Sequence, residues 1–334
     1  MPRSTQISHF MPMELHPVLE LMARRLSERS EPGNRKDGFR LALVVEGGAM
    51  RGVVSSAMLW ALEEGGFLPC FDLAVGCSAG AMNAASFLAG ASGGCTREYA
   101  GAFSSRRFIN PARVLLGRPM LDLDFSVDFS STVMDPGRHR RVLESSIPLH
   151  CIATDVDDAR RAVLSDFQDI GELRLALEAS SCMPLVAGPP VEFRGRRYLD
   201  GGICEAIPLA SARELGATHA LVLQTRPRGL RYPPPQGFLT KLIEIRLRRI
   251  HPILPALYHH RNHIYDLTCD QVDADQAKGA NALPAVFGLR LPEGTPPVHR
   301  LERRAKVLRE STATARDFTR REVVEPVLER AGRG

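Results

Sequence analysis

Ser78 is the residue whose type and surroundings most clearly suit it to chemistry. It lies at the centre of the pentapeptide Gly76-Cys77-Ser78-Ala79-Gly80, between an apolar run and a stretch of small residues with helical character. A serine on a sharp strand-to-helix turn needs glycine neighbours, because glycine has no Cβ to obstruct the bend or the helix behind it. The N-terminus of that helix supplies unpaired amides and a partial positive charge for a developing alkoxide. The pattern predicts a nucleophilic serine in an elbow with Gly76 and Gly80; for the pentapeptide alone, a plain tight turn is the alternative.

A second glycine-rich turn precedes another predicted helix and consists of Gly47, Gly48, Ala49, Met50, Arg51 and Gly52. Successive amides in such a turn can point the same way and bind an anion, so a phosphate cradle, a dinucleotide loop and an oxyanion hole compete. A phosphate loop of the Walker type would end in G-K-[ST], and a dinucleotide fingerprint would have glycine where Ala49 stands. An oxyanion hole fits best, because the predicted nucleophile lies one helix downstream on the next strand.

Asp200 is the third candidate, since it ends a predicted strand and is followed by Gly201 and Gly202. Two glycines allow such a carboxylate to project from a turn, where it could act as a base. An Asx-turn without chemistry is the alternative for this feature taken alone.

These three motifs, in this order, resemble those of the patatin-like phospholipases. The family pattern is a glycine-rich oxyanion loop, a G-x-S-x-G nucleophile elbow and a later D-G-[AG] that carries the second catalytic residue; the matching segments are 47–52, 76–80 and 200–202. The resemblance covers about residues 38–225, including the run 179–184 ahead of the aspartate, and extends more weakly to about residue 310.

The resemblance implies a serine lipid acyl hydrolase, a phospholipase A or lysophospholipase-like esterase, with a Ser78–Asp200 dyad and no histidine. Ser78 would attack an ester carbonyl while Asp200 takes its proton, which requires a partly desolvated carboxylate of raised basicity. Amides around Gly48 and Ala49 would hold the oxyanion, and water would then hydrolyse the acyl-enzyme. The expected substrate is a lipid or another acyl ester, and no cofactor is needed.

The chain departs from the family pattern at Ala49, which stands in place of the third glycine of the oxyanion loop. An alanine at a position of positive φ would cost about 1 kcal/mol or more. Arg51, two residues further on, could orient the loop or meet a phosphate group.

Two other functions compete with the dyad. An ordinary α/β-hydrolase with a serine, acid and histidine triad would need a late histidine, for which His219, His251 and His299 are candidates. A lipid- or anion-binding protein, in which the altered loop no longer supports catalysis, is the alternative that is not an enzyme.

The sequence favours no metal site. His259, His260 and His263 are clustered, but they lie in a basic stretch without nearby carboxylates, and no H-E-x-x-H occurs. The acidic turn at residues 155–158 lacks the rest of a calcium loop, so a solvated hairpin turn explains it better.

Alternating strands and helices predict an α/β fold, a three-layer α/β/α sandwich with a mostly parallel central sheet. Strands are expected at residues 41–45, 71–75, 149–154, 162–165 and 220–223, the first of them buried on both faces of the sheet, with a hairpin formed by 191–193 and 197–199. Helices are expected at residues 53–64, 79–88, 173–180 and 209–215.

We expect three regions: a leader over 1–37, partly helical or flexible, a catalytic core over 38–225, which the resemblance covers, and a basic amphipathic extension over 226–334 packed on the core. Between residues 226 and 261 eight basic residues accompany one acidic residue, a local charge of +7 on a chain whose net charge is +5. We expect this segment to contact an anionic membrane surface peripherally, and we expect no nucleic-acid partner.

Composition indicates a cytoplasmic globular protein. Hydrophobic residues make up 44% of the 334 residues, and the seven cysteines include no C-x-x-C pair, which is typical of reduced thiols. The first residues lead into no apolar segment of the kind found in signal peptides. No run approaches 18 apolar residues, so we expect no transmembrane helix.

Overall fold

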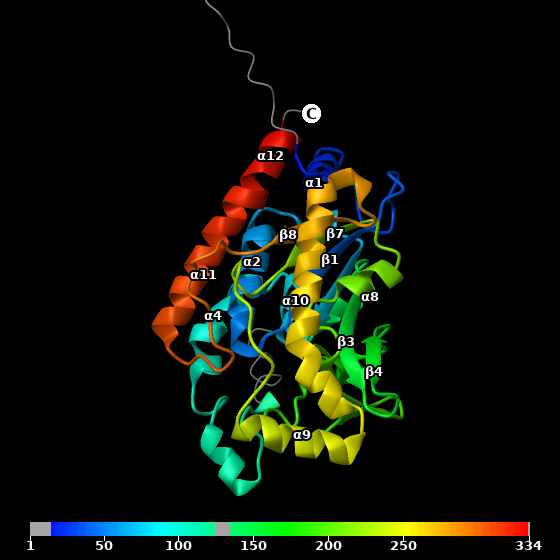
Figure 1. The fold of residues 1–334 in the computed structure, drawn as a ribbon. Coiled ribbons are helices and arrows are strands. Elements are labelled where there is room, and N and C mark those ends of the chain that lie inside the picture. Colours follow the sequence, from blue (N-terminus) through cyan, green and yellow to red (C-terminus); the bar gives the residue numbers. More distant parts are fainter. Residues whose placement is uncertain (1–14, 124–133, 333–334) are drawn as a thin grey trace, which may run out of the picture.

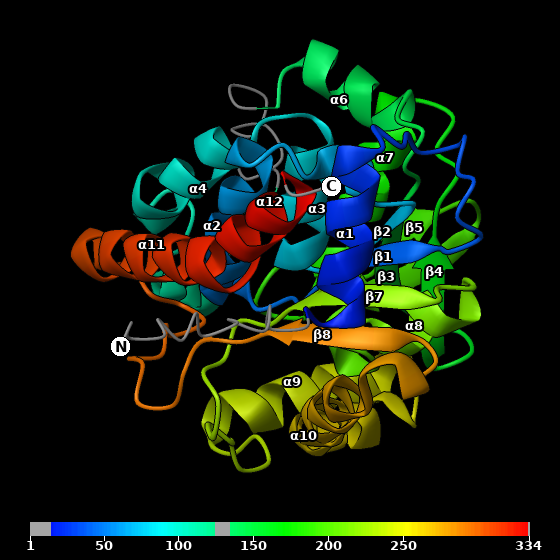
Figure 2. The same ribbon diagram turned by 90° about the horizontal axis from the view of Figure 1, so that it is seen from above.

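A central sheet with helices on both faces forms the protein (Figures 1 and 2). The computed structural model describes residues 15–123 and 134–332. Their sheet has eight strands in the order β5-β6-β3-β2-β1-β7-β8, with β4 paired to β3. The strands are β1 (Leu41–Val45), β2 (Leu73–Cys77), β3 (Leu149–Asp155), β4 (Arg160–Leu164), β5 (Val191–Phe193), β6 (Arg196–Asp200), β7 (His219–Leu223) and β8 (Ala285–Leu289). The predicted three-layer α/β/α sandwich is confirmed.

The centre of the sheet is parallel and one side is antiparallel. β1 lies parallel between β2 and β7, β3 continues parallel to β2, and β8 continues parallel to β7. β4 and β6 both pair antiparallel with β3, and β5 forms a hairpin with β6. Because β1 is covered by helices on both faces, all five of its residues are buried, which explains its uninterrupted apolar sequence.

The helices divide between the two faces. α8 (Leu209–Glu214) and α10 (Leu254–Lys278) cover one face, and α9 (Phe238–Ile250) lies beside α10 (Figure 2). Most of the others lie on the opposite side: α1 (Pro17–Ser27), α2 (Gly52–Glu64), α3 (Ala79–Leu88), α4 (Ser92–Ala100), α6 (Pro136–Leu143), α7 (Ile170–Ser181), α11 (Ala305–Thr319) and α12 (Glu325–Ala331). A π-helical turn, Arg320–Val324, joins the last two.

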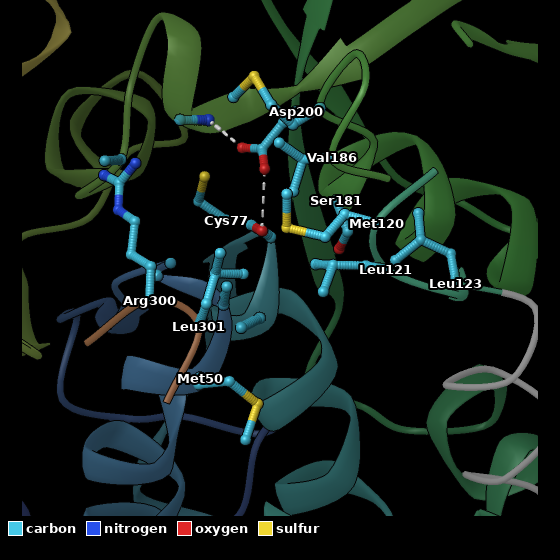
Figure 3. Close-up of a pocket in the computed structure, with 18 of the residues that line it drawn as sticks. Met50, Cys77, Met120, Leu121, Leu123, Ser181, Val186, Asp200, Arg300 and Leu301 are labelled. Atoms are coloured by element: carbon cyan, nitrogen blue, oxygen red, sulfur yellow. Dashed lines mark hydrogen bonds between the residues drawn. The ribbon is translucent and has the colours of Figure 1, made fainter. Parts of the chain in front are cut away.

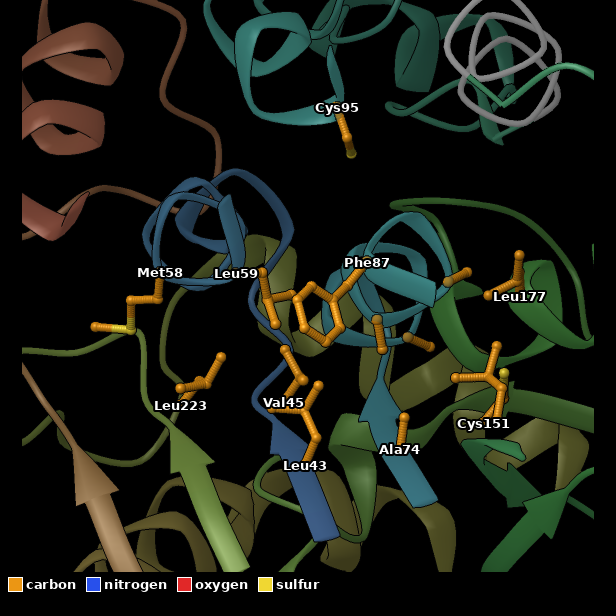
Figure 4. Packing of buried hydrophobic residues seen from close by; sticks show 14 of the residues in the cluster. Leu43, Val45, Met58, Leu59, Ala74, Phe87, Cys95, Cys151, Leu177 and Leu223 are labelled. Atoms are coloured by element: carbon orange, nitrogen blue, oxygen red, sulfur yellow. The ribbon is translucent and has the colours of Figure 1, made fainter. Parts of the chain in front are cut away.

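The larger hydrophobic core fills the space between the sheet and α2, α3 and α7 (Figure 4). Alternate strand residues face it, and helix side chains meet them: Leu43, Val45, Ala74, Cys151 and Leu223 from the sheet, and Met58, Leu59, Phe87 and Leu177 from the helices. The intervening residues of β1, Ala42 and Val44, belong to the second core under α8 and α10. This packing fixes the carboxyl ends of β1 and β2 at the same edge of the sheet, where the two glycine-rich turns follow.

Both flanking regions contribute to this core. Helix α1 lies in the predicted leader and its Val18 and Met22 are fully buried, whereas residues 1–14 of that leader lie outside the described residues. β8 adds a strand from the predicted extension to the sheet. The three-region division stays a prediction. None of the described helices combines the length and the apolar character that crossing a bilayer requires.

Candidate active site

Ser78 occupies a strained backbone position between β2 and α3. β2 ends at Cys77 and α3 begins at Ala79, so the serine itself makes the turn, with φ 52° and ψ −127°. A non-glycine residue in this region costs on the order of 1–3 kcal/mol, and the surrounding packing must maintain it. The predicted strand and helix therefore meet at the serine, as an elbow requires.

Close packing explains the two elbow glycines. A Cβ on Gly80 would lie 2.3 Å from the Val45 carbonyl oxygen, and one on Gly76 would lie 2.5 Å from the Cα of Ala81. Both contacts are with backbone atoms, so a side chain at either position would push α3 away from the sheet.

Asp200 lies next to Ser78. The antiparallel pairing of β6 with β3 brings the aspartate to the end of the sheet that β2 reaches two strands away. The Ser78 hydroxyl donates a hydrogen bond to Asp200 Oδ2 at 3.1 Å, and the Gly202 amide donates to Oδ1 at 2.7 Å (Figure 3). The first distance lies within the range of about 2.6–3.2 Å expected between a nucleophile and its base.

Burial raises the pKa of the Asp200 carboxyl group above its usual value. The amide of Gly202, the charges of Arg300 and Arg261 and the Ser78 hydroxyl partly oppose this shift by favouring the ionised form. A carboxylate with a raised pKa is a stronger base, which is the property that direct proton transfer from serine needs.

The neighbouring glycine of the acid motif also has no room for a side chain. A Cβ on Gly201 would lie 2.2 Å from the Ile152 carbonyl oxygen of β3. The turn after β6 is thereby pressed against the sheet, which holds Asp200 in place.

The oxyanion loop leaves two amides without an acceptor among the described residues. The Gly47 amide donates to the Ala206 carbonyl at 3.1 Å, and the Met50 amide to the Arg300 carbonyl at 3.1 Å. The amides of Gly48 and Ala49, between these two anchors, donate no hydrogen bond. Both residues line the same pocket as Ser78, so these amides are the donors that an oxyanion would meet.

Arg51 lies behind this loop, where only 3% of the residue is exposed. Its Nη2 lies 3.7 Å from Glu46 Oε1, and Glu46 accepts further hydrogen bonds from Thr225 and from Tyr265. The arginine therefore anchors the loop to the carboxyl end of β1. Gly52 starts α2, and a Cβ there would lie 2.5 Å from the hydroxyl oxygen of Tyr99.

Comparison with known proteins gives a family for this constellation. The sequence model of the patatin-like phospholipase family matches residues 43–213, which include all three motifs. The chain belongs to the patatin-like phospholipase family. The resemblance seen in the sequence is confirmed.

Several proteins are similar to this family member. The uncharacterized protein YjjU of Escherichia coli is 30% identical over 231 residues, which are 68% of this chain and 63% of YjjU. Mouse patatin-like phospholipase domain-containing protein 7 is 27% identical over 61% of this chain, but only 15% of its own length is covered. Mouse 1-acylglycerol-3-phosphate O-acyltransferase Pnpla3 is 27% identical over 41% of this chain and 33% of its own. The chain thus spans less than two thirds of each of these relatives.

One residue of this patatin-like site was missed by the analysis of motifs. The Ser78 amide donates a hydrogen bond to Ser180 Oγ at 2.8 Å, and Ser180 Oγ donates to the Ile152 carbonyl at 2.6 Å. Ser180, at the end of α7, thereby ties the strained elbow to β3. Its only signal in the sequence was its place in the run 179–184, which the family shares.

None of the histidines considered for a triad forms a hydrogen bond with Ser78 in the described part of the chain. His219 lies in β7 and packs against Phe39, and His251 ends α9, where it accepts a hydrogen bond from the Ile253 amide. His299 does line the pocket, but its Nδ1 accepts from the Leu301 amide at 3.2 Å. Among the described residues no group of three or more His, Cys, Asp or Glu side chains is placed to hold a metal ion.

A largely apolar pocket of about 280 Å³ opens beside Ser78. One wall comes from the segment after α4, including Phe103, Phe108, Met120, Leu121 and Leu123. The C-terminal third of the chain supplies much of the rest: Leu239, Ile243, Tyr258, Arg261, His299, Arg300 and Leu301. These wall residues are far from the three motifs along the chain, so no local pattern marks them as binding substrate.

Ala49→Gly is expected to raise the free energy of unfolding by about 1 kcal/mol. Ala49 has a φ of 51°, in the left-handed region that glycine adopts freely and alanine adopts only at an energetic cost. If the strain at Ala49 also shifts its amide from the best position for an oxyanion, Ala49→Gly should raise kcat by up to about tenfold, the equivalent of 1.4 kcal/mol. Denaturant unfolding and steady-state kinetics measure the two effects. The control is Ala313→Gly on the exposed side of α11, which should lose about 0.5–1 kcal/mol; equal losses in both variants would contradict the strain argument.

Proposed function

We propose that this protein is a serine esterase of the phospholipase A or lysophospholipase type. Its membership of the patatin-like family implies lipid acyl hydrolase activity. One observation carries the proposal: a serine on a strained elbow donates directly to a partly buried aspartate with a raised pKa, and both residues line a largely apolar pocket. The apolar wall suits an acyl chain, and the two free amides suit an oxyanion.

The proposed reaction has two halves. Ser78 Oγ attacks the ester carbonyl carbon while Asp200 accepts the hydroxyl proton, and the carbonyl oxygen becomes an oxyanion at the Gly48 and Ala49 amides. The tetrahedral intermediate collapses, Asp200 returns the proton to the departing alcohol, and an acyl-enzyme remains. Water then adds to the acyl group with Asp200 as base, which releases the fatty acid and restores Ser78.

Covalent labelling tests the proposal. A fluorophosphonate probe should modify wild-type protein at a single peptide containing residues 76–80, and an untargeted screen of lipids should show release of free fatty acid. Protein carrying Ser78→Ala serves as the blank in both assays. Absence of labelling and of hydrolysis would favour the lipid-binding protein over the enzyme.

We further propose that α9 places the pocket at an anionic membrane surface. α9 lies at one end of the molecule (Figure 1), and its Leu239 and Ile243 line the pocket. Its outer side exposes Phe238 (78%) and Ile245 (50%). Basic side chains accompany them and have no ion pair among the described residues: Lys241, Arg246, Arg248 and Arg249. Apolar and basic side chains together on one exposed helix are typical of interfacial binding.

The other basic residues of the segment 226–261 have different roles. Arg228 and Arg231 pair with Asp273 and Asp270 of α10, and Arg226 is buried. Within the segment 226–261, the exposed basic residues without an ion pair among the described residues are therefore those of α9. A cytoplasmic location also stays a proposal, supported by seven cysteines that are all free thiols.

Vesicle binding of the wild-type protein should weaken as ionic strength rises above about 0.1 M, where the Debye length falls below about 10 Å. The double variant Arg246→Gln/Arg248→Gln should bind vesicles containing phosphatidylserine about tenfold or more weakly, since each basic residue contributes about 1 kcal/mol. Co-sedimentation measures both effects. The matched control is Arg309→Gln/Arg321→Gln, exposed residues elsewhere on the surface. If vesicle binding responds neither to salt nor to anionic lipid, α9 does not bind the membrane through its charges, and its basic side chains are simply solvated.

A further inference from the structure

Four arginines gather on one side of the pocket. Arg261 of α10 and Arg300, in the loop between β8 and α11, line the cavity directly, and Arg51 and Arg226 are buried nearby. In Figure 3 the Arg300 side chain lies on one side of Asp200, and Met120, Leu121 and Leu123 lie on the other. The site thus has an apolar wall and a cationic wall, with the Ser78–Asp200 contact between them.

The two buried arginines have their own partners. Arg51 lies 3.7 Å from Glu46, and Arg226 lies 3.9 Å from Asp266 and stacks on Tyr265 with its guanidinium carbon 3.6 Å from the ring centre. Arg261 and Arg300 differ, because neither forms an ion pair with any described residue. Arg261 stacks on the ring of Tyr258 at 3.8 Å, which leaves the edge of the guanidinium available for hydrogen bonds.

Asp200 cannot neutralise both pocket arginines. It is the carboxylate whose ionised form both of them favour, but it carries a single charge and already accepts from Ser78 and Gly202. Four guanidinium groups therefore face three carboxylates, those of Glu46, Asp266 and Asp200. Burial and the neighbouring arginines lower the pKa of Arg300 to about 10, as expected for a cation with this few anionic neighbours. Partly desolvated cations without ion-pair partners are costly, and an anionic ligand would relieve that cost.

We propose that Arg261 and Arg300 bind the phosphate group of a phosphorylated acyl-ester substrate. The inference rests on the proposed esterase function and adds to it the residues that recognise the phosphate. Two guanidinium groups match a phosphate with paired hydrogen bonds. With the phosphate on the cationic wall and the acyl chain on the apolar wall, the ester carbonyl lies over Ser78. The phosphate itself does not react; it fixes the direction in which the substrate enters.

Hydrolysis of two matched substrates tests the subsite. For 1-acylglycerol 3-phosphate and the 1-acylglycerol with the same chain, both below their critical micelle concentrations, the ratio of kcat/KM values should favour the phosphate by about tenfold or more. Arg261→Gln and Arg300→Gln should each lower that ratio about tenfold, mainly through the KM of the phosphorylated substrate, and Arg300→Lys should restore part of it. Arg321→Gln is the control and should leave the ratio unchanged, because Arg321 is an exposed residue of the π-helical turn after α11 and does not line the pocket. A ratio near one in wild type, or one that both variants leave unaltered, would overturn the proposal.

A binding assay separates this proposal from the esterase function. Wild-type protein should bind the ether analogue 1-alkylglycerol 3-phosphate, which no esterase cleaves, at least about tenfold more tightly than 1-alkylglycerol. That preference should vanish in Arg261→Gln/Arg300→Gln even if no ester is hydrolysed. Glycerol 3-phosphate and inorganic phosphate form the third arm. If either binds as tightly as the ether phosphate, the arginines recognise free phosphate and the lipid assignment is wrong.

Discussion

Ser78→Ala is expected to lower kcat for acyl-ester hydrolysis by about a thousandfold or more, because no other group can form the acyl-enzyme. The thermal midpoint should change little. Alanine keeps the Cβ and the backbone strain of the elbow, and the lost hydrogen bond to Asp200 contributes only about 1 kcal/mol. Fatty-acid release and thermal unfolding measure the two quantities on the same preparations.

Ser78→Gly provides the matched comparison. It also lacks the hydroxyl group, but glycine adopts φ 52° and ψ −127° without strain, so it should be inactive and more stable than Ser78→Ala by about 1 kcal/mol or more. The pair would show that the elbow sacrifices stability to present the nucleophile. Turnover above a few per cent of wild type in a clean sample of either variant would remove Ser78 from the mechanism.

The three motifs could be found from sequence because each one depends on its nearest neighbours. Gly76 and Gly80 allow the turn at Ser78, and the loop 47–52 carries its amides within one turn of chain. The meeting of the first two motifs could be expected as well, since the parallel strands β1 and β2 end at a common edge. Asp200 reaches the same site through the antiparallel pairing of β6 with β3. The strain at Ala49 could be predicted in the same local way. Alanine stands where the family pattern has glycine, and its φ of 51° confirms the strained conformation.

The rest of the site depends on contacts between distant segments. Ser180 supports the elbow from 102 positions away, and the Arg300 carbonyl anchors the Met50 amide of the oxyanion loop. Nothing in the residues around Arg300 indicates this contact. The strand β8 was missed for a similar reason, because Ala285–Leu289 is a short apolar run without a motif. Strand limits also shifted: β2 runs to Cys77, two residues beyond the predicted end, since its pairing with β3 continues to the elbow.

Asp200→Asn is expected to lower kcat by about 10²–10⁴-fold, the usual contribution of a positioned base. Asparagine keeps the size of the side chain and can still accept from the Gly202 amide, so the turn after β6 should survive. Single changes of His219, His251 or His299 to glutamine should keep activity within a few-fold of wild type, because the Ser78 hydroxyl donates to Asp200 and to none of these side chains. If the loss of one of these histidines alone abolished activity, the triad mechanism would be favoured over the dyad.

The pH dependence of kcat/KM and of stability, compared between wild type and Asp200→Asn, independently tests whether Asp200 is the base. Asp200 must be ionised to accept a proton, so wild-type kcat/KM should fall as pH drops through a pKa that burial has raised above the usual value of a carboxyl group. A carboxyl group with a raised native pKa binds its proton more tightly in the folded state; it therefore favours folding at low pH, and this advantage is lost as pH rises through the native pKa. Asparagine never ionises, so Asp200→Asn should be at least as stable as wild type near pH 7, and its relative stability should decline on acidification. An acid limb that persists in the residual activity of Asp200→Asn would mean that another group accepts the Ser78 proton.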